Sequence, residues 1–114
     1  MMSKEVITIR ERSDVKIVDV NTNLGSYEVV NLRNTLDALV SQNTRTILVN
    51  LSQVQHICSA AIGALVGALR RLHRQGGELK IFGLAANIKQ TFDLVGATGI
   101  LTIYDAESGA LNDF

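Results

Sequence analysis

Short β-branched segments open the chain. Residues 6–10 and 15–20 are rich in valine and isoleucine, and the polar pair Ser13 and Asp14 separates them. β-branched residues favour strands, and a short polar break between two such runs favours a turn. The opening therefore predicts an antiparallel pair of strands, and it leaves the type of turn open.

Apolar residues at helical spacing come next. They recur every three or four positions and would share one side of a helix: Val29, Leu32, Leu36, Leu39 and Val40. Ser26 is placed to cap the start of this helix, and Glu28 in its first turn suits the helix dipole. The pattern predicts a helix with one face turned inward.

From residue 46 onward the pattern alternates between strand and helix. Residues 46–51 form a nearly continuous apolar run, as expected of a central strand covered on both faces. A second helix is expected after residue 58, and Gly76 and Gly77 would end it. Its inward positions are Ile62, Leu65, Val66, Leu69 and Leu72.

The last third repeats this alternation. Residues 79–82 and 101–104 are expected to be strands, with a helix at residues 88–95 between them and Asp105 as the cap of a final helix. Such alternation implies parallel strands joined by right-handed crossovers. The sequence thus predicts an α/β fold, with a mixed sheet of about five strands and about four helices.

The composition is that of a globular protein. The chain has 114 residues, enough for one domain over residues 1–114, with 46% hydrophobic and 19% charged residues. Eleven basic side chains balance eleven acidic ones, and no Lys/Arg block stands out. Such a chain lacks the electrostatic field that attracts nucleic acid or anionic lipid, so neither is an expected partner.

The sequence also favours a cytoplasmic location. Residues 1–12 are charged and lack the apolar stretch of a secretory signal. The longest apolar run, residues 60–69, is about half the roughly 20 residues that a membrane-spanning helix needs, so no membrane insertion is expected. With Cys58 as its one cysteine, the chain cannot form an internal disulfide.

The stretch that carries functional information leads from the central strand into the second helix. Residues 50–63 read Asn-Leu-Ser-Gln-Val-Gln-His-Ile-Cys-Ser-Ala-Ala-Ile-Gly. They resemble the signature of STAS domains, in which a strand ending in Asp/Asn-Leu-Ser is followed by Asp-Ser-small-Gly-Leu-Gly at the start of the second helix. Ser59, Ile62 and Gly63 match it, and residues 76–79 and 88–96 resemble the family's passage from the fourth strand to the third helix.

The resemblance is to the anti-sigma factor antagonist branch, and it implies a function. Members of that branch bind a serine kinase that doubles as an anti-sigma factor, and this kinase phosphorylates the motif serine, here Ser59. The unphosphorylated form would hold the kinase and free the sigma factor, and a serine phosphatase would reset the switch. The implied protein is no enzyme and needs no cofactor. Its expected partner surface comprises Cys58, Ser59, Ala60, Ala61 and Ile62.

Three positions depart from the family pattern. Cys58 stands where the family has Asp, Ala61 stands where it has Gly, and residues 22–25 read Thr-Asn-Leu-Gly in place of Gly-x-Leu-Asp. Only Leu24 matches in that last motif. The missing carboxylates change what a kinase would recognise, which leaves open an interaction subunit without phosphorylation, in a signalling assembly or beside a membrane transporter.

Other interpretations concern single residues. Ser59 could be a plain N-cap. Cys58, with His56 two residues away, could be a reactive thiol, but the favoured interpretation is a small buried side chain. His56 and His73 are too scattered for a metal site.

Two further groups of residues have structural explanations. Arg70, Arg71 and Arg74 are expected to face solvent on the second helix. Gly63 and Gly67 lack the lysine and the preceding strand of a phosphate-binding loop. They are expected instead to allow close packing of that helix on the sheet.

Overall fold

The computed structural model of the chain describes residues 6–114. Within them a single sheet has the strand order β1-β2-β3-β4-β5. The strands are β1 (Ile7–Arg12), β2 (Val15–Val20), β3 (Thr46–Asn50), β4 (Glu78–Phe82) and β5 (Thr102–Tyr104). β1 and β2 are antiparallel, and the other neighbours are parallel. This confirms the predicted mixed sheet; the expectation about a leader segment falls partly on residues 1–5, outside the described residues.

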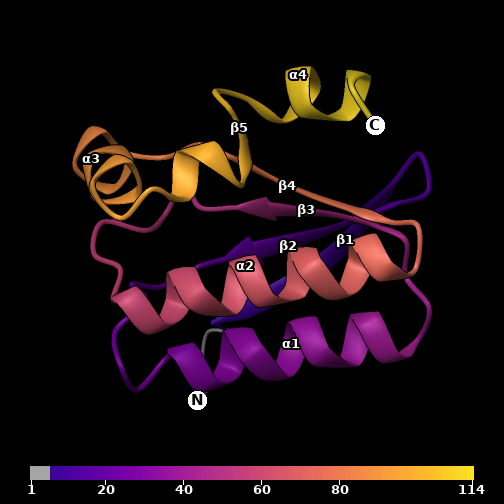
Figure 1. The fold of residues 1–114 in the computed structure, drawn as a ribbon, viewed down its shortest axis with the longest axis horizontal. Coiled ribbons are helices and arrows are strands. Elements are labelled where there is room, and N and C mark those ends of the chain that lie inside the picture. The colour runs from indigo at the N-terminus through magenta and orange to yellow at the C-terminus, as the bar shows by residue number, and fades with distance from the viewer. Residues whose placement is uncertain (1–5) are drawn as a thin grey trace, which may run out of the picture.

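Helices cover both faces of the sheet, unequally. The helices are α1 (Val29–Ser41), α2 (Ser59–Arg74), α3 (Ala86–Leu94) and α4 (Glu107–Asn112), with a 3-10 turn, η1, at Ala97–Gly99. The long helices α1 and α2 lie side by side on one face, and the short α4 lies on the other (Figure 1). α3 lies at the end of the sheet where the parallel strands finish, the same end at which α1 and α2 begin (Figure 1).

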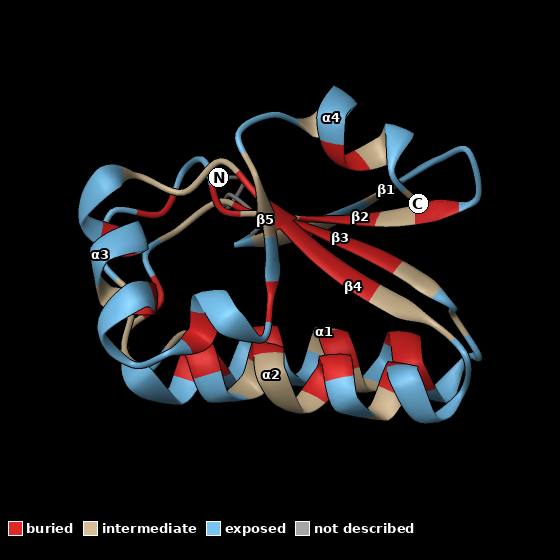
Figure 2. Ribbon diagram, turned by 45° about the horizontal axis from the view of Figure 1, so that its top comes forward, coloured by how far each residue is buried: buried red, intermediate tan, exposed pale blue. Residues whose placement is uncertain are grey.

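The core has two parts, one on each side of β3. Ile47 and Val49 belong to the large cluster under α1 and α2, and Leu48 points the other way. On that second face a small cluster under α4 contains Val15, Ile17, Leu48, Phe82 and Ala110. Figure 2 shows the buried residues concentrated along the inner strands and the sheet-facing sides of the helices. The prediction that β3 is covered on both faces is confirmed.

Two turns explain why the chain changes direction where it does. Ser13 and Asp14 have positive φ angles of 51° and 66°, as the two central residues of a type I′ hairpin turn require. Gly76, with φ of 76°, ends α2 in the left-handed conformation, and the Gly77 N–H donates to the Leu72 carbonyl at 2.7 Å. The predicted glycine stop of this helix is confirmed.

The two predicted side-chain caps are wrong. Ser26 is exposed and caps nothing: the Val29 N–H donates to the Gly25 carbonyl at 3.1 Å, and the Gly25 N–H donates to Glu28 Oε1 at 3.1 Å. A backbone turn thus leads into α1 and replaces the cap. At α4 the N-cap position is held by Ala106, not Asp105, and it has no side-chain cap hydrogen bond.

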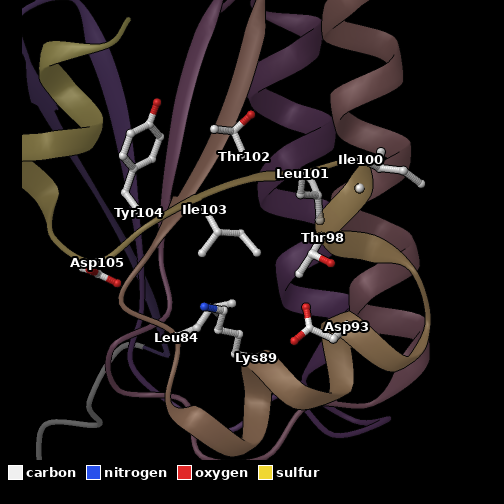
Figure 3. A pocket seen from close by; sticks show the side chains of 11 residues that line it. Leu84, Lys89, Asp93, Thr98, Ile100, Leu101, Thr102, Ile103, Tyr104 and Asp105 are labelled. Carbon is white, nitrogen blue, oxygen red and sulfur yellow. The ribbon is translucent and has the colours of Figure 1, made fainter.

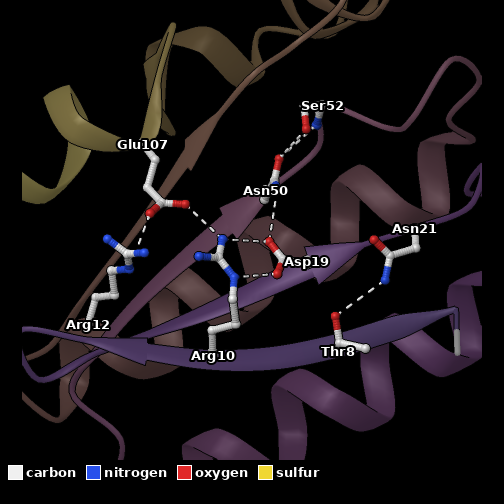
Figure 4. Close-up of polar contacts among 8 residues, drawn as sticks. All are labelled: Thr8, Arg10, Arg12, Asp19, Asn21, Asn50, Ser52 and Glu107. Carbon is white, nitrogen blue, oxygen red and sulfur yellow. Dashed lines mark hydrogen bonds and ion pairs between the residues drawn. The ribbon is translucent and has the colours of Figure 1, made fainter.

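A polar network joins α4 to the sheet. The Arg10 guanidinium donates two hydrogen bonds to Asp19, at 2.6 and 2.9 Å, and one to Glu107 at 2.7 Å. Asn50 Nδ2 donates to the same Asp19 carboxylate at 2.8 Å (Figure 4). These bonds, Arg10 first among them, lower the pKa of Asp19 below its usual value. The network connects β1, β2, β3 and α4.

Candidate functional site

Ser59 is the first residue of α2, and its side chain is exposed. The N-cap position is occupied by Cys58, which has extended backbone angles (φ −89°, ψ 160°) and forms no side-chain cap hydrogen bond. The prediction of Ser59 as the N-cap is therefore wrong by one position. Within residues 6–114 no hydrogen bond engages the Ser59 hydroxyl, so the hydroxyl is accessible to a partner or a modifying enzyme.

The loop that precedes Ser59 is held by the turn between β2 and α1. Asn23 Oδ1 accepts the backbone N–H groups of Gln55 at 2.8 Å and of His56 at 3.3 Å. The Leu24 N–H donates to the His56 carbonyl at 2.9 Å, and the Cys58 N–H donates to the Leu24 carbonyl at 2.8 Å. These bonds form a short parallel bridge between segments that are about thirty residues apart in the chain.

A hydrogen bond from α3 also holds the same loop. Asn87, at the start of α3, donates from Nδ2 to the Gln55 carbonyl at 2.8 Å. Neither Asn23 nor Asn87 was predicted from the sequence as a site residue. Each is an ordinary asparagine in a polar turn or helix start, and only the fold brings them to the same loop. Leu24, which matches the family motif, is fully buried and supplies the backbone of the bridge.

The predicted contact residues divide into two groups. Ser59 and Ala60 are exposed and Cys58 is half-buried, but Ala61 and Ile62 are buried, at 0% and 5% exposure. Consecutive residues of a helix point in different directions, so Ser59 and Ala60 face outward while Ala61 and Ile62 lie in the core. One helical turn on from Ala60, the residue that continues the exposed face is Gly63.

A surface groove begins beside Ala60 and runs between α1 and α2. It has a volume of about 520 Å³, and its α2 wall consists of Ala60, Gly63, Ala64, Gly67 and Arg71. A Cβ placed on Gly63 or Gly67 would meet no atom within 4 Å. The expected packing of these glycines against the sheet is therefore wrong, and they open the groove to solvent instead.

Apolar side chains are also exposed at the start of α1. Tyr27 is 89% exposed and Val30 is 50% exposed. α1 and α2 begin at the same end of the molecule (Figure 1), and the bridge from Leu24 to Ile57 ties together the segments that lead into them. Exposed aromatic and aliphatic residues are typical of a surface that contacts another protein.

The charged residues of α2 lie at its far end. Arg71, predicted to face solvent, is half-buried and pairs with Asp37 of α1 at 2.6 Å. His73 lies 3.0 Å from Glu78, and Arg70 and Arg74 are exposed. The first turn of α2 contains no acidic residue, so nothing there offsets the positive end of the helix dipole.

The redox and metal interpretations find no supporting geometry. In the part of the chain that the structure describes, no hydrogen bond joins the His56 ring to Cys58, and no group of three or more His, Cys, Asp or Glu side chains could hold a metal ion. The same residues contain no helix long and apolar enough to cross a bilayer.

Comparison with known proteins places the chain in a family. The model of the STAS domain matches residues 6–110. The chain belongs to the STAS domain family. It is 31% identical over 86 residues to the anti-sigma-B factor antagonist of Staphylococcus aureus, covering 75% of this chain and 80% of that one. It is 26% identical over 107 residues to the anti-sigma-B factor antagonist of Listeria monocytogenes, covering 93% of each. The relatives of this STAS protein thus carry the name anti-sigma factor antagonist, and the chain belongs with them by sequence.

Solved structures show the same fold. Protein TM1081 of Thermotoga maritima superposes with a TM-score of 0.82 at 21% identity, covering 98% of this chain and 90% of that one. SpoIIAA in its unphosphorylated form gives 0.73 at 16% identity, covering 94% of each. The murine anion transporter Slc26a9 gives 0.75 at 17% identity, covering 90% of this STAS protein and 18% of the transporter. At these identities the likeness concerns the fold alone.

Proposed function

We propose that this protein is a cytoplasmic partner-switching regulator controlled by phosphorylation of Ser59. In this proposal the unphosphorylated form binds an anti-sigma serine kinase and so frees the sigma factor. Phosphorylation of Ser59 by that kinase ends the contact, and a serine phosphatase restores it. The observation that carries the proposal is the exposed Ser59 hydroxyl on the first turn of α2, which no cap or hydrogen bond within residues 6–114 engages.

The helix start can accept a phosphate. A phosphoserine adds about −1.5 to −2 charges at neutral pH. At Ser59 this charge would lie beside the unpaired N–H groups of α2 and the positive end of its dipole, with no acidic residue in the first turn to oppose it. Such an arrangement stabilises an anion by roughly 0.3–1 kcal/mol. The fold therefore has no reason to change on phosphorylation.

Phosphorylation of Ser59 should weaken the contact with the partner, although it leaves the fold intact. On α2 the exposed residues that follow Ser59 on its side of the helix, Ala60 and Gly63, are small. Tyr27, in the turn before α1, and Val30, in the first turn of α1, add exposed aromatic and aliphatic side chains. Docking a partner on this surface would bury the phosphate, and a dianion that loses water without gaining a cation is strongly unfavourable. Release would thus follow from local electrostatics at Ser59.

A second candidate function is a STAS interaction subunit that is not phosphorylated, in a signalling assembly or a transporter complex. The observation that favours it is Cys58 at the N-cap of α2, where the family has Asp. A kinase would have to recognise Ser59 without that carboxylate. In this alternative the same helix start and groove would contact a different protein, and Ser59 would remain unmodified.

The two candidates are separated by purifying the protein from its native cell and analysing both the partners and the Ser59 peptide by mass spectrometry. The switch predicts an anti-sigma serine kinase among the partners, with phosphorylated Ser59 confined to the unbound pool. Ser59→Asp should lose the kinase, whereas the matched control Ser41→Asp, at an exposed serine at the far end of α1, should keep it. Transporter or scaffold partners with Ser59 never modified would refute the switch.

A further inference from the structure

β5 leaves one edge of the sheet open. It pairs with β4 alone among the described strands. The Tyr104 carbonyl accepts the Gly83 N–H at 3.0 Å, so the backbone groups of Tyr104 point toward β4. Because these groups alternate along a parallel strand, the N–H and C=O of Ile103 point to the open edge. An open strand edge is a template for a further extended chain.

A groove follows this edge. It has a volume of about 440 Å³ and is lined by three consecutive residues of β5, Thr102, Ile103 and Tyr104. Side chains of consecutive strand residues point to opposite faces, so a groove that touches all three lies along the backbone edge. Its opposite wall comes from α3 and the segments on either side of it, with Leu84 and Ile100 supplying apolar surface. In Figure 3 the Ile103 side chain points into the space between β5 and α3.

The charges around the groove favour a basic ligand. Asp93 and Asp105 line it together with one lysine, Lys89, and all three are exposed (Figure 3). Within residues 6–114 none of the three belongs to an ion pair. With two carboxylates and one ammonium group, the lining of the groove has a net negative charge, and its exposed border (the rim) is therefore acidic. A second copy of this chain would bring two acidic rims together, which disfavours pairing of β5 with itself.

We propose that the open edge of β5 binds an extended, basic peptide segment of a partner protein as an additional strand. The backbone of the peptide would pair with the N–H and C=O of Ile103. One aliphatic side chain would enter the groove beside Leu84 and Ile100, and Lys or Arg residues would lie near Asp93 and Asp105. Strand addition of this kind obtains affinity from the backbone and specificity from the side chains. None of residues 58–62 lines the groove, so this site is separate from the Ser59 surface.

Amide NMR spectra of the full chain, recorded during titration with defined peptides, test the proposal. The probe is a blocked peptide of alternating Lys and Val, about nine residues long, near the upper length of ordinary strands. We expect saturable shifts centred on residues 102–104. A peptide with Glu in place of Lys, and a fully N-methylated version of the probe, should each bind at least about tenfold more weakly.

Variants of the protein sharpen the test. Ile103→Pro removes the outward N–H and leaves the Thr102 and Tyr104 N–H groups free to pair with β4. It should therefore weaken binding of the probe peptide by at least about tenfold, while the amide signals of the rest of the protein persist. If that variant does not fold, Asp93→Lys combined with Asp105→Lys should reverse the preference toward the acidic peptide. Ser59→Asp should leave the affinity for the probe unchanged, which separates this proposal from the Ser59 switch.

Three results would overturn the proposal. The first is no saturable shift in β5 at millimolar peptide. The second is equal binding of the N-methylated peptide, which would show that the backbone edge is not used. The third is a concentration-dependent shift of residues 102–104 without peptide, which would show that a second copy of the chain occupies the edge.

Discussion

The side-chain oxygen of Asn23 accepts the backbone N–H of Gln55 at 2.8 Å and thereby ties the turn before α1 to the loop that leads to Ser59. The two residues are 32 positions apart in the chain. Because the same oxygen also accepts the His56 N–H, Asn23 holds two consecutive donors of this loop. The position of Ser59 on the surface therefore depends on a residue outside the motif that contains it.

Replacing this asparagine should loosen the loop. Asn23→Ala removes the acceptor of two N–H groups, and we expect a loss of about 1 kcal/mol in the free energy of unfolding. Hydrogen exchange should accelerate more at the Gln55 and His56 amides than at other amides. Asn34→Ala, at an exposed position of α1, is the control and should neither lower the free energy of unfolding nor speed exchange at residues 55 and 56. Unchanged exchange at residues 55 and 56 in Asn23→Ala would contradict the assigned role.

Two glycines should respond to alanine in opposite ways. A Cβ on Gly77 would lie 2.3 Å from the Arg45 carbonyl oxygen, so Gly77→Ala must shift the backbone and should destabilise by about 1–3 kcal/mol. Gly63 has no atom within 4 Å of such a Cβ, and Gly63→Ala in the helix should stabilise by about 0.5–1 kcal/mol. Urea unfolding of both variants measures this.

The second of these variants also probes the groove between α1 and α2. The added methyl group of Gly63→Ala would project into a groove that the partner-switching proposal places beside the contact surface. A more stable protein with weaker partner binding is the expected result. Unchanged partner affinity would show that the partner does not enter the groove at this position.

Ser59 should contribute little to stability. Because Cys58 occupies the N-cap position, Ser59→Ala should lower the free energy of unfolding by less than the roughly 1 kcal/mol typical of a lost N-cap. Phosphorylation or Ser59→Asp should leave the protein as stable or slightly more stable, because the charge lies at the start of α2. Chemical denaturation of Ser59→Ala, Ser59→Asp and the phosphorylated protein tests this. A loss of about 1 kcal/mol or more in the free energy of unfolding of Ser59→Ala would show that Ser59 does cap α2.

The ion pair between Arg10 and Asp19 predicts a dependence of stability on pH. Hydrogen bonds from Arg10 and Asn50 hold the pKa of Asp19 below its usual range. A carboxylate whose pKa is lower in the folded state stabilises fully above its unfolded pKa of about 3.9, and this contribution is lost as pH falls through the folded pKa. Part of the acid destabilisation below about pH 4 should therefore disappear in Asp19→Asn, as measured by urea unfolding at stepwise lower pH. Identical pH profiles for both proteins would contradict the prediction.

Part of the site could be predicted and part could not, for physical reasons that differ by residue. Ser59 lies inside a local motif, so its place at the start of a helix followed from neighbouring residues. The error of one position in its capping role arose because the backbone of Cys58, not its side-chain type, meets the conditions for the N-cap position. The two wrong caps, Ser26 and Asp105, have the same origin: a polar residue near a helix start suits several positions, and the backbone path selects one.

The sequence by itself determined the order and type of the strands and helices, because the spacing of Val29, Leu32 and Leu36, or the run at Thr46–Asn50, depends only on near neighbours. The mixed sheet followed from that order. Only the tertiary structure decided that Ala60 is exposed while Ala61 is buried, and that Gly63 opens a groove while Gly77 touches a neighbouring backbone. Likewise, only the folded chain brings Asn23 and Asn87 to one loop. Such contacts join segments that are distant in the sequence, and their geometry exists only once the helices have packed on the sheet.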